Sequence, residues 1–186
     1  DSSVVQGISE ADLAEGYRVL NVGSWRASAE YSPATVNVGV GDLWATNVKA
    51  WSFADNAIKR VIASYNEPFV TLPNGPLAAA KVFFMWGARV ARPNNDGRFI
   101  FTCAQSETAD HYINETDGQI RNTTTYLTET NTSAENAYMI SEIEVNLAAA
   151  GWEDRPTLFG LGRNGTAATD TFGVAVIVYG IQILVK

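Results

Sequence analysis

The alternation of apolar and polar positions predicts short strands along most of this chain. Residues 34–40 place a valine at every second position, which is the period of a half-buried strand. The last fourteen residues, Gly173 to Lys186, carry a single charge and are rich in Val and Ile, which pack well on a pleated sheet. An exposed apolar edge strand would aggregate, so we expect this run in the middle of a sheet. The fold is then expected to close on its own C-terminal run, which leaves little chain for a tail or an anchor.

Further strand candidates follow one another, with turn-forming residues between them. Two hairpins are expected, one across Ala54-Asp55-Asn56 and one across RPNNDG, because these turns separate apolar runs. Residues 105–136 are rich in Thr and Asn, and we expect a long irregular excursion there with one exposed strand. The expected strands lie at 34–40, 43–53, 57–65, 69–72, 77–90, 98–103, 123–127, 138–147, 157–163 and 173–186.

Two of these runs fit a helix as well as a strand. Residues 52–63 fit a helix capped by Ser52, and residues 134–150 fit one that ends at Gly151. As a strand, the second run places these side chains on the face opposite to Glu142 and Glu144: Met139, Ser141, Ile143, Val145 and Leu147. We interpret the first run as a strand, whereas the residues of the second run alone leave both alternatives open.

The N-terminal residues have a different pattern. Ser9 with Asp12 three residues later resembles a helix N-cap pair, and Gly16 resembles a stop, so one short helix is expected. We divide the chain into an N-terminal segment, 1–23, and a β-sandwich domain, 24–186. The predicted fold is all-β: a two-sheet antiparallel sandwich of jelly-roll type with at most one or two short helices.

Composition limits the classes of function. The 186 residues suit one domain with a sizeable core, and the net charge is −7. Residues 94–186 contain twelve acidic and five basic side chains, whereas residues 1–93 contain eight of each. No basic stripe could displace phosphate counterions, so we expect no nucleic-acid partner. No apolar run is long enough to span a bilayer, so we expect no membrane insertion.

Candidate catalytic and metal-binding groups are sparse. Cys103 is the single cysteine, so an intrachain disulfide and a cysteine zinc site are excluded. His111 is the single histidine, so any catalytic triad or histidine-bearing metal site would have to use it, and a polar loop is the simpler interpretation of its surroundings. Carboxylate pairs for glycoside hydrolysis exist at Glu142 with Glu144 and at Glu153 with Asp154, although solvated surface acids are the simpler interpretation. Clustered oxygens for Ca²⁺ occur at Asp110, Glu115 and Asp117, without EF-hand spacing. We expect no catalytic residue, no metal and no cofactor.

Aromatic side chains are the more informative group, because sugars present C–H faces that stack on aromatic rings. Trp86 lies in an apolar strand and is expected in the core, whereas Trp152 follows Gly151 in a polar segment. The predicted ligand-binding residues are Trp152, Asp154, Arg155, Tyr112 and Tyr126.

The order of features over 57–186 resembles the β-sandwich domains of tailed-bacteriophage virion proteins, such as fibre tips, knobs and decorations. The matching features are TLPNGP, a strand pair with a central Trp (KVFFMWGARV and DGRFIFTCA), a Thr-rich excursion, IEVNL, LFGLGR with Arg163, the turn Thr169-Asp170-Thr171, and GIQILVK. The resemblance implies a strand at 138–147, because in such domains the element before the strand with the arginine is itself a strand. It also implies a non-enzymatic virion protein, a homotrimer that contacts other virion proteins and binds a host-surface glycan or attaches to the particle. The alternative is a secreted or enzyme-appended carbohydrate-binding module, and a glycan-cleaving enzyme is a third possibility.

Overall fold

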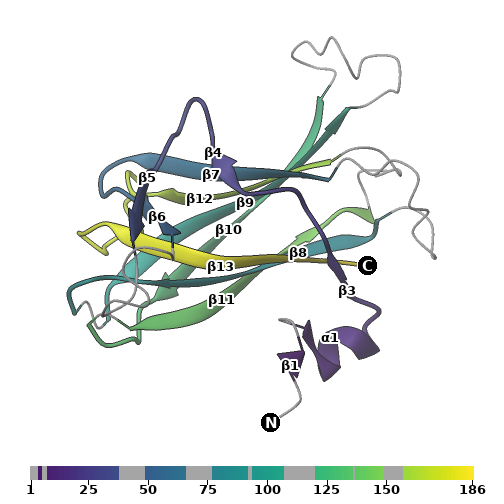
Figure 1. Cartoon of the computed structure of the whole chain (residues 1–186), viewed down its shortest axis with the longest axis horizontal. Coiled ribbons are helices and arrows are strands. Elements are labelled where there is room, and N and C mark those ends of the chain that lie inside the picture. The colour runs from purple at the N-terminus through teal and green to yellow at the C-terminus, as the bar shows by residue number, and fades with distance from the viewer. Residues whose placement is uncertain are drawn as a thin grey trace.

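Two large antiparallel sheets make up most of the described part of the chain, beside a small two-stranded pair near the N-terminus (Figure 1). The structure is a computed structural model that describes residues 4–5, 8–37, 49–65, 77–91, 94–106, 120–135, 137–148 and 157–186. The five-stranded sheet has the order β10 (Ile120–Thr130), β9 (Asp96–Ser106), β12 (Thr157–Asn164), β7 (Ile58–Tyr65) and β4 (Arg26–Ala27). The six-stranded sheet has the order β11 (Tyr138–Asn146), β8 (Ala79–Gly87), β13 (Val176–Val185), β6 (Lys49–Phe53) and β5 (Ala34–Asn37), with β3 (Arg18–Leu20) paired to β13. The predicted all-β sandwich of jelly-roll type is confirmed.

The C-terminal run lies in the middle of a sheet, as its apolar sequence predicts. β13 pairs with β8 along one side, and with β6 and β3 along the other. Its inward side chains are fully buried at Val176, Val178, Ile183 and Val185. A strand with this composition is stable only when both of its edges and its apolar face are covered.

Both runs that were ambiguous between helix and strand are strands. Residues 52–63 fall on β6 and β7, which are joined by a short turn at 54–57. β11 alternates strictly: Ile143 and Val145 are buried, whereas Glu142 and Glu144 are exposed. This alternation with period 2 gives β11 one apolar and one polar face, which a helix of the same sequence would mix.

Both predicted hairpins are wrong, because the paired runs belong to different sheets. β6 pairs with β5 and β13, whereas β7 pairs with β4 and β12. β8 pairs with β11 and β13, whereas β9 pairs with β10 and β12. Turn residues mark where a strand ends, but they do not say which sheet the next strand joins. In this sandwich the inner faces of the two sheets pack on each other, and the chain crosses from one sheet to the other at both of these turns.

The Thr-rich segment is more regular than we expected. In place of a short strand at 123–127, β10 extends from Ile120 to Thr130 and pairs with β9 over its whole length. Residues 107–119 lie outside the described residues. Threonine is β-branched, so a run of alternating Thr suits a strand with one solvated face.

The predicted N-terminal helix is confirmed as α1 (Glu10–Ala14), which follows the small pair β1 (Val4–Val5) and β2 (Ile8–Ser9). The Ser9 hydroxyl accepts from the Asp12 amide, and the Asp12 carboxylate accepts from the Ser9 amide. At the other end, Gly16 has φ of 90°, and the Tyr17 amide donates to the Asp12 carbonyl. Both helix ends therefore satisfy their free backbone groups through local residues. The division at residue 23 stays a prediction, and β3 within that segment pairs with β13.

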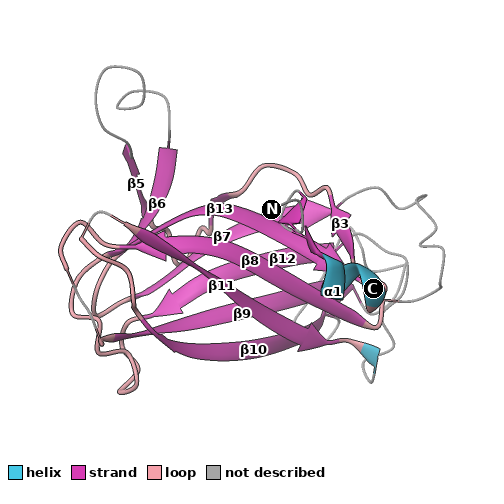
Figure 2. Ribbon diagram, turned by 90° about the horizontal axis from the view of Figure 1, so that it is seen from below, coloured by secondary structure: helices cyan, strands magenta, loops and turns pink. Residues whose placement is uncertain are grey.

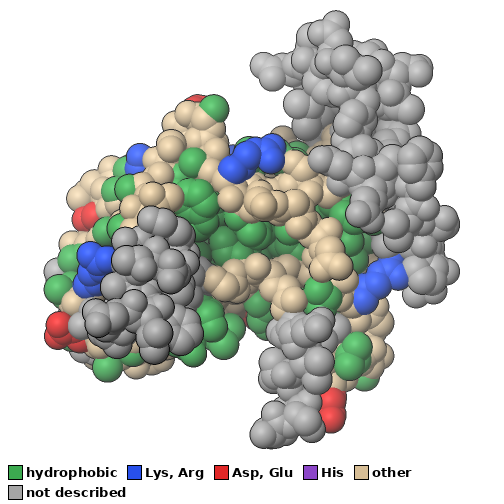
Figure 3. Space-filling model, in the orientation of Figure 1, with side chains coloured by type: hydrophobic (Ala, Val, Ile, Leu, Met, Phe, Trp, Pro, Cys, Tyr) green, Lys and Arg blue, Asp and Glu red, His purple; other side chains and the backbone are tan. Residues whose placement is uncertain are grey.

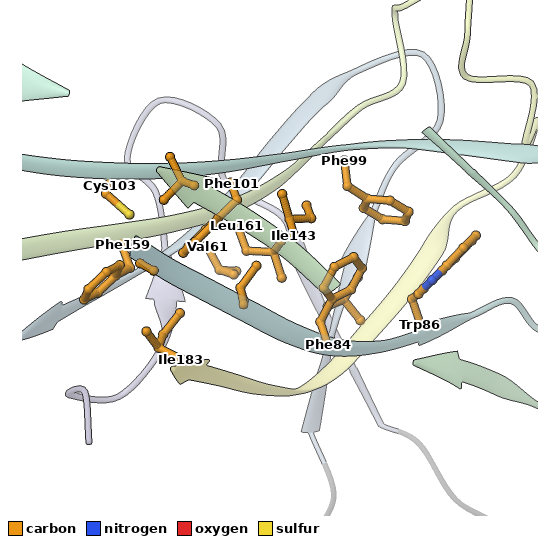
Figure 4. Packing of buried hydrophobic residues seen from close by; sticks show 14 of the residues in the cluster. Val61, Phe84, Trp86, Phe99, Phe101, Cys103, Ile143, Phe159, Leu161 and Ile183 are labelled. Carbon is orange, nitrogen blue, oxygen red and sulfur yellow. The ribbon is translucent and has the colours of Figure 1, made fainter. Parts of the chain in front are cut away.

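The hydrophobic core fills the space between the sheets (Figure 4). Phe99 lies between Phe84 and Trp86, with ring centroids 4.9 Å and 4.8 Å away, and Phe101 stacks on Phe159. Trp86 and Cys103 are both fully buried, as predicted. One face of the molecule has a central hollow with hydrophobic side chains at its base (Figure 3). Some apolar residues, such as Trp25, pack against the core but are only partly buried.

A buried arginine joins the two sheets at one corner. Arg163 on β12 is fully buried, and its guanidinium donates to both carboxylate oxygens of Asp170, at 2.8 and 2.6 Å. It also donates to the Asp55 carboxylate and to the backbone carbonyls of Phe53 and Val174. These bonds account for all five N–H donors of an arginine, and two carboxylates pair with its single positive charge.

Candidate functional site

A pocket of about 670 Å³ lies between α1 and the outer face of the six-stranded sheet. Figure 2 shows α1 beside the C-terminus, at one end of the strands that form this face. The pocket is lined by two groups of residues, from α1 with its cap and from three neighbouring strands: Ser9, Ala11, Asp12, Glu15, Lys81, Phe83, Phe84, Met85, Ile140, Glu142, Gly180 and Gln182. A concave site with an apolar floor and a few convergent polar groups is the usual form of a small-ligand site.

The floor of the pocket is set by strand register. Glu142 on β11, Phe83 on β8 and Gln182 on β13 are direct cross-strand neighbours, so the ring is flanked by a carboxylate and an amide. Directly opposed side chains in an antiparallel pair have Cβ atoms about 5 Å apart. In the next row Ile140 faces Met85, and the Ile140 side chain is 59% exposed. An aromatic ring between two polar side chains therefore lies beside an exposed aliphatic surface.

An irregularity in β13 keeps this floor open. The register of β13 with β8 shifts between Tyr179 and Gln182, and Gly180 in this bulge has φ of 61°. A Cβ atom at Gly180 would lie 2.7 Å from the Met85 sulfur, which no side chain can accept without a shift of Met85. Glycine at this position therefore gives the backbone a left-handed conformation and leaves Met85 at the pocket surface.

Lys81 attaches α1 to the sheet. Its Nζ is 2.7 Å from the Asp12 carboxylate, 3.9 Å from Glu142 and 3.8 Å from Glu144, and its side chain is only 9% exposed. The same ammonium lies 4.7 Å from the Tyr17 ring centroid. Burial alone would lower the pKa of Lys81, but the hydrogen bond to Asp12 and the charge of Glu142 outweigh it and raise this pKa.

Two other groups hold the same contact. The Tyr17 hydroxyl donates to Glu144 at 2.6 Å, and burial together with this bond raises the pKa of Tyr17. Burial would raise the pKa of Asp12, but the bonds from Lys81 and Ser9 prevail and lower it. A five-residue helix is not stable alone in water, so α1 depends on these contacts for its position as the pocket wall.

Most of the ligand-binding residues predicted from the sequence cannot be placed. Trp152, Asp154, Arg155 and Tyr112 lie outside the described residues, as do His111, the Glu153 pair and the three candidate calcium ligands. The structure places only Tyr126, on β10, where its side chain is 52% exposed. Tyr126 is on the five-stranded sheet, so it does not belong to the pocket beside α1.

Tyr126 is part of a polar surface of its own. The Arg98 guanidinium lies 4.8 Å from the Tyr126 ring centroid and donates to the Thr128 hydroxyl at 2.7 Å. Two rows along, the hydroxyls of Thr102 and Thr124 are hydrogen-bonded to each other. This surface is an exposed strand face outside any concave site described above. A cation lies over its ring, as the Lys81 ammonium does over the Phe83 ring in the pocket, 5.9 Å from the centroid.

The structure also locates the acids considered for glycoside hydrolysis. Glu142 and Glu144 share one face of β11, and Lys81 lies within 4 Å of both carboxylates. Among the described residues, no group of three His, Cys, Asp or Glu side chains is arranged to hold a metal ion. No helix in the described part of the chain is long and apolar enough to cross a bilayer.

The residues of the pocket were not identified from the sequence, although one signal was present. The run KVFFMWG alternates, so Lys81, Phe83 and Met85 share the face opposite to Trp86. A lysine on one face of a strand indicates that its neighbours two residues away also face outward. The contact between Lys81 and Asp12 joins residues 69 positions apart and has no local signature.

Comparison with known proteins gives only distant structural likeness. No model of a protein family matches the sequence, and no curated protein sequence does. The chain is similar to TmCBM61 in complex with beta-1,4-galactotriose (TM-score 0.41, 14% identity, 87% of this chain and 88% of that one). It is similar to a family 16 carbohydrate-binding module (0.42, 12%, 83% and 86%) and to a family 35 module from Clostridium thermocellum (0.41, 13%, 87% and 98%). Likeness at this level assigns no function. The phage resemblance is not tested by it and stays a prediction.

Proposed function

We propose that this protein is a carbohydrate-binding domain and that a glycan binds in the pocket between α1 and the six-stranded sheet. The observation that carries the proposal is the row Glu142, Phe83 and Gln182. A sugar ring has an apolar C–H face and a rim of hydroxyls. Phe83 offers an aromatic surface for the first, while the carboxylate and the amide on either side offer an acceptor and a donor for the second.

The exposed aliphatic surface next to this row supports an extended ligand. Ile140 and Met85 continue the apolar floor one row beyond Phe83. Two rows on one face of a strand are separated by two residues, about 7 Å, which is somewhat longer than one sugar unit. We therefore expect an oligosaccharide to contact both rows.

The test is titration calorimetry with neutral oligosaccharides of glucose, galactose, xylose and mannose. Ile140→Ser removes an exposed part of the floor at little cost to the fold. We expect the affinity to fall about fivefold because the apolar contact is lost. Leu158→Ser is the matched control, because Leu158 is an exposed apolar residue on the five-stranded sheet. If both variants lose affinity, or if neither does, the ligand does not bind at the pocket.

The virion role and the homotrimer are kept as predictions from the sequence. Light scattering on the isolated chain distinguishes a trimeric virion protein from a monomeric carbohydrate-binding module. A particle of three times 20.1 kDa would favour a fibre tip or decoration protein, and a monomer would favour a carbohydrate-binding module. Multivalent display would raise the avidity of a weak single site in the first case.

A further inference from the structure

The charges around the pocket are unbalanced. Three of its lining residues are acids, Asp12, Glu15 and Glu142, and the only base among them is Lys81. Glu144 lies behind Lys81 at 3.8 Å, and Lys186 lies 3.4 Å from Glu15. Counting these six groups gives four negative and two positive charges, a net charge of −2.

Neither of the two cations is free to meet an anionic ligand. The Lys81 ammonium is within 4 Å of three carboxylates and is almost fully covered. Lys186 is paired with Glu15 and lies 4.5 Å from the Tyr17 ring centroid. To bind a ligand carboxylate, Lys81 would have to give up a buried partner, which would leave a carboxylate of the protein unpaired. Lys186 belongs to an exposed pair and does not line the pocket.

The acid nearest to the aromatic floor is accessible. The Glu142 side chain is 55% exposed, and its carboxylate reaches Lys81 only at 3.9 Å, so the group can accept further hydrogen bonds from a ligand. Glu142 is also the direct neighbour of Phe83. A ligand stacked on Phe83 therefore meets a carboxylate at its rim, in a pocket that is negative overall.

We infer that the pocket selects glycans by charge: sugars with a free amine bind most tightly, neutral sugars less tightly, and uronic acids least. This inference rests on the proposed function and adds the class of sugar. An ammonium on the sugar pairs with Glu142, whereas a carboxylate at the same place meets a like charge without a free cation.

The experiment compares three β-1,4-linked hexasaccharides with one skeleton and different charge, built from glucosamine, glucose or glucuronate. Calorimetry at mildly acid pH, where the amine is protonated, is expected to give the glucosamine chain an affinity about fivefold above that of the glucose chain, the size of one exposed ion pair. The difference is expected to shrink as salt is added, because an exposed pair is screened. The glucuronate chain is expected to bind weakest.

Glu142→Gln removes the proposed charge contact, and Glu30→Gln is the matched control because Glu30 is an exposed acid between β4 and β5. We expect the first variant to abolish the advantage of glucosamine and the second to keep it. Equal affinity for all three chains, or an effect of Glu142→Gln no larger than that of Glu30→Gln, would overturn the charge inference and leave the glycan site standing. Absence of binding to every chain would contradict the proposed function and the inference together.

Discussion

Removal of the buried cation at the corner of the sandwich is expected to destabilise the fold severely. Arg163→Met deletes a guanidinium that is fully buried and leaves the Asp170 carboxylate, also fully buried, without its counter-ion. Asp170 keeps two backbone donors, the amides of Arg98 and Phe172, at 3.1 and 3.3 Å. These bonds cannot replace a full charge, and the carbonyls of Phe53 and Val174 lose their donors as well.

The expected loss is about 3–5 kcal/mol in the free energy of unfolding, as for other buried pairs that lose one partner. This is a large share of the free energy of unfolding of a typical domain, which is about 5–15 kcal/mol. Chemical denaturation followed by tryptophan fluorescence measures it. The double variant Arg163→Met with Asp170→Asn is expected to recover part of the loss, because the unpaired charge is gone.

The control is the exposed pair between Lys186 and Glu15, whose side chains are 30% and 57% exposed. Lys186→Met is expected to cost about 0–1 kcal/mol, because water screens the charges and ordering two long side chains costs entropy. A loss for Arg163→Met that is no larger than the loss for Lys186→Met would refute the reasoning, because it would mean that Arg163 is solvated.

Three further predictions concern the helix contact and the core. The pKa of Asp12 is lowered in the folded protein. Its contribution to stability is therefore present above the ordinary value of 3.8 and is lost as the pH falls through the lowered pKa. When the free energy of unfolding is measured against pH, Asp12→Asn should lose less stability in acid than the unmodified chain. Burial raises the pKa of the Cys103 thiol, so Ellman's reagent should label it only in denaturant, and fast labelling of the folded chain would contradict its burial. Gly87→Ala places a Cβ atom against the Ala137 carbonyl oxygen, so we expect a loss of about 1–3 kcal/mol in the free energy of unfolding. A thermal melting point equal to that of the unmodified protein would show instead that the backbone there can move.

The elements of the fold could be predicted from the sequence because their signals are local. Alternation gave the buried face of β11 once the resemblance had favoured a strand over a helix there, and the apolar C-terminal run indicated a central strand before any partner was known. Ser9, Asp12 and Gly16 similarly predicted the ends of α1, since caps are made within a few residues. In each case a short segment contains the whole physical cause.

Strand partners could not be predicted in the same way. The turn between β6 and β7 contains Asp55, which accepts from Arg163, and nothing in residues 54–57 reveals that bond. The turn residues alone favoured a hairpin, whereas the connection passes from one sheet to the other. The resemblance to virion proteins named both Arg163 and Asp170 as features, but only the structure brings them together as an ion pair.

The sequence did not reveal the candidate site, because its aromatic residue is neither a tryptophan nor in a loop. Its ring is Phe83, in a run that we expected to lie in the core beside Trp86. One wall of the pocket comes from α1 and its caps, which are held on the sheet by contacts between residues 69 and 127 positions apart. Only packing of the complete chain brings these residues together.

The most direct test of the account is a nuclear magnetic resonance titration of the full chain with the neutral oligosaccharide that binds best. Methyl signals of Ile140 and Met85 and the side-chain amide of Gln182 report on the floor of the pocket. If the glycan binds in the pocket, these signals shift together, with one binding constant, while the methyl signals of Leu158 on the other sheet do not move. Shifts confined to the surroundings of Tyr126 and Arg98, with the pocket signals unchanged, would contradict it.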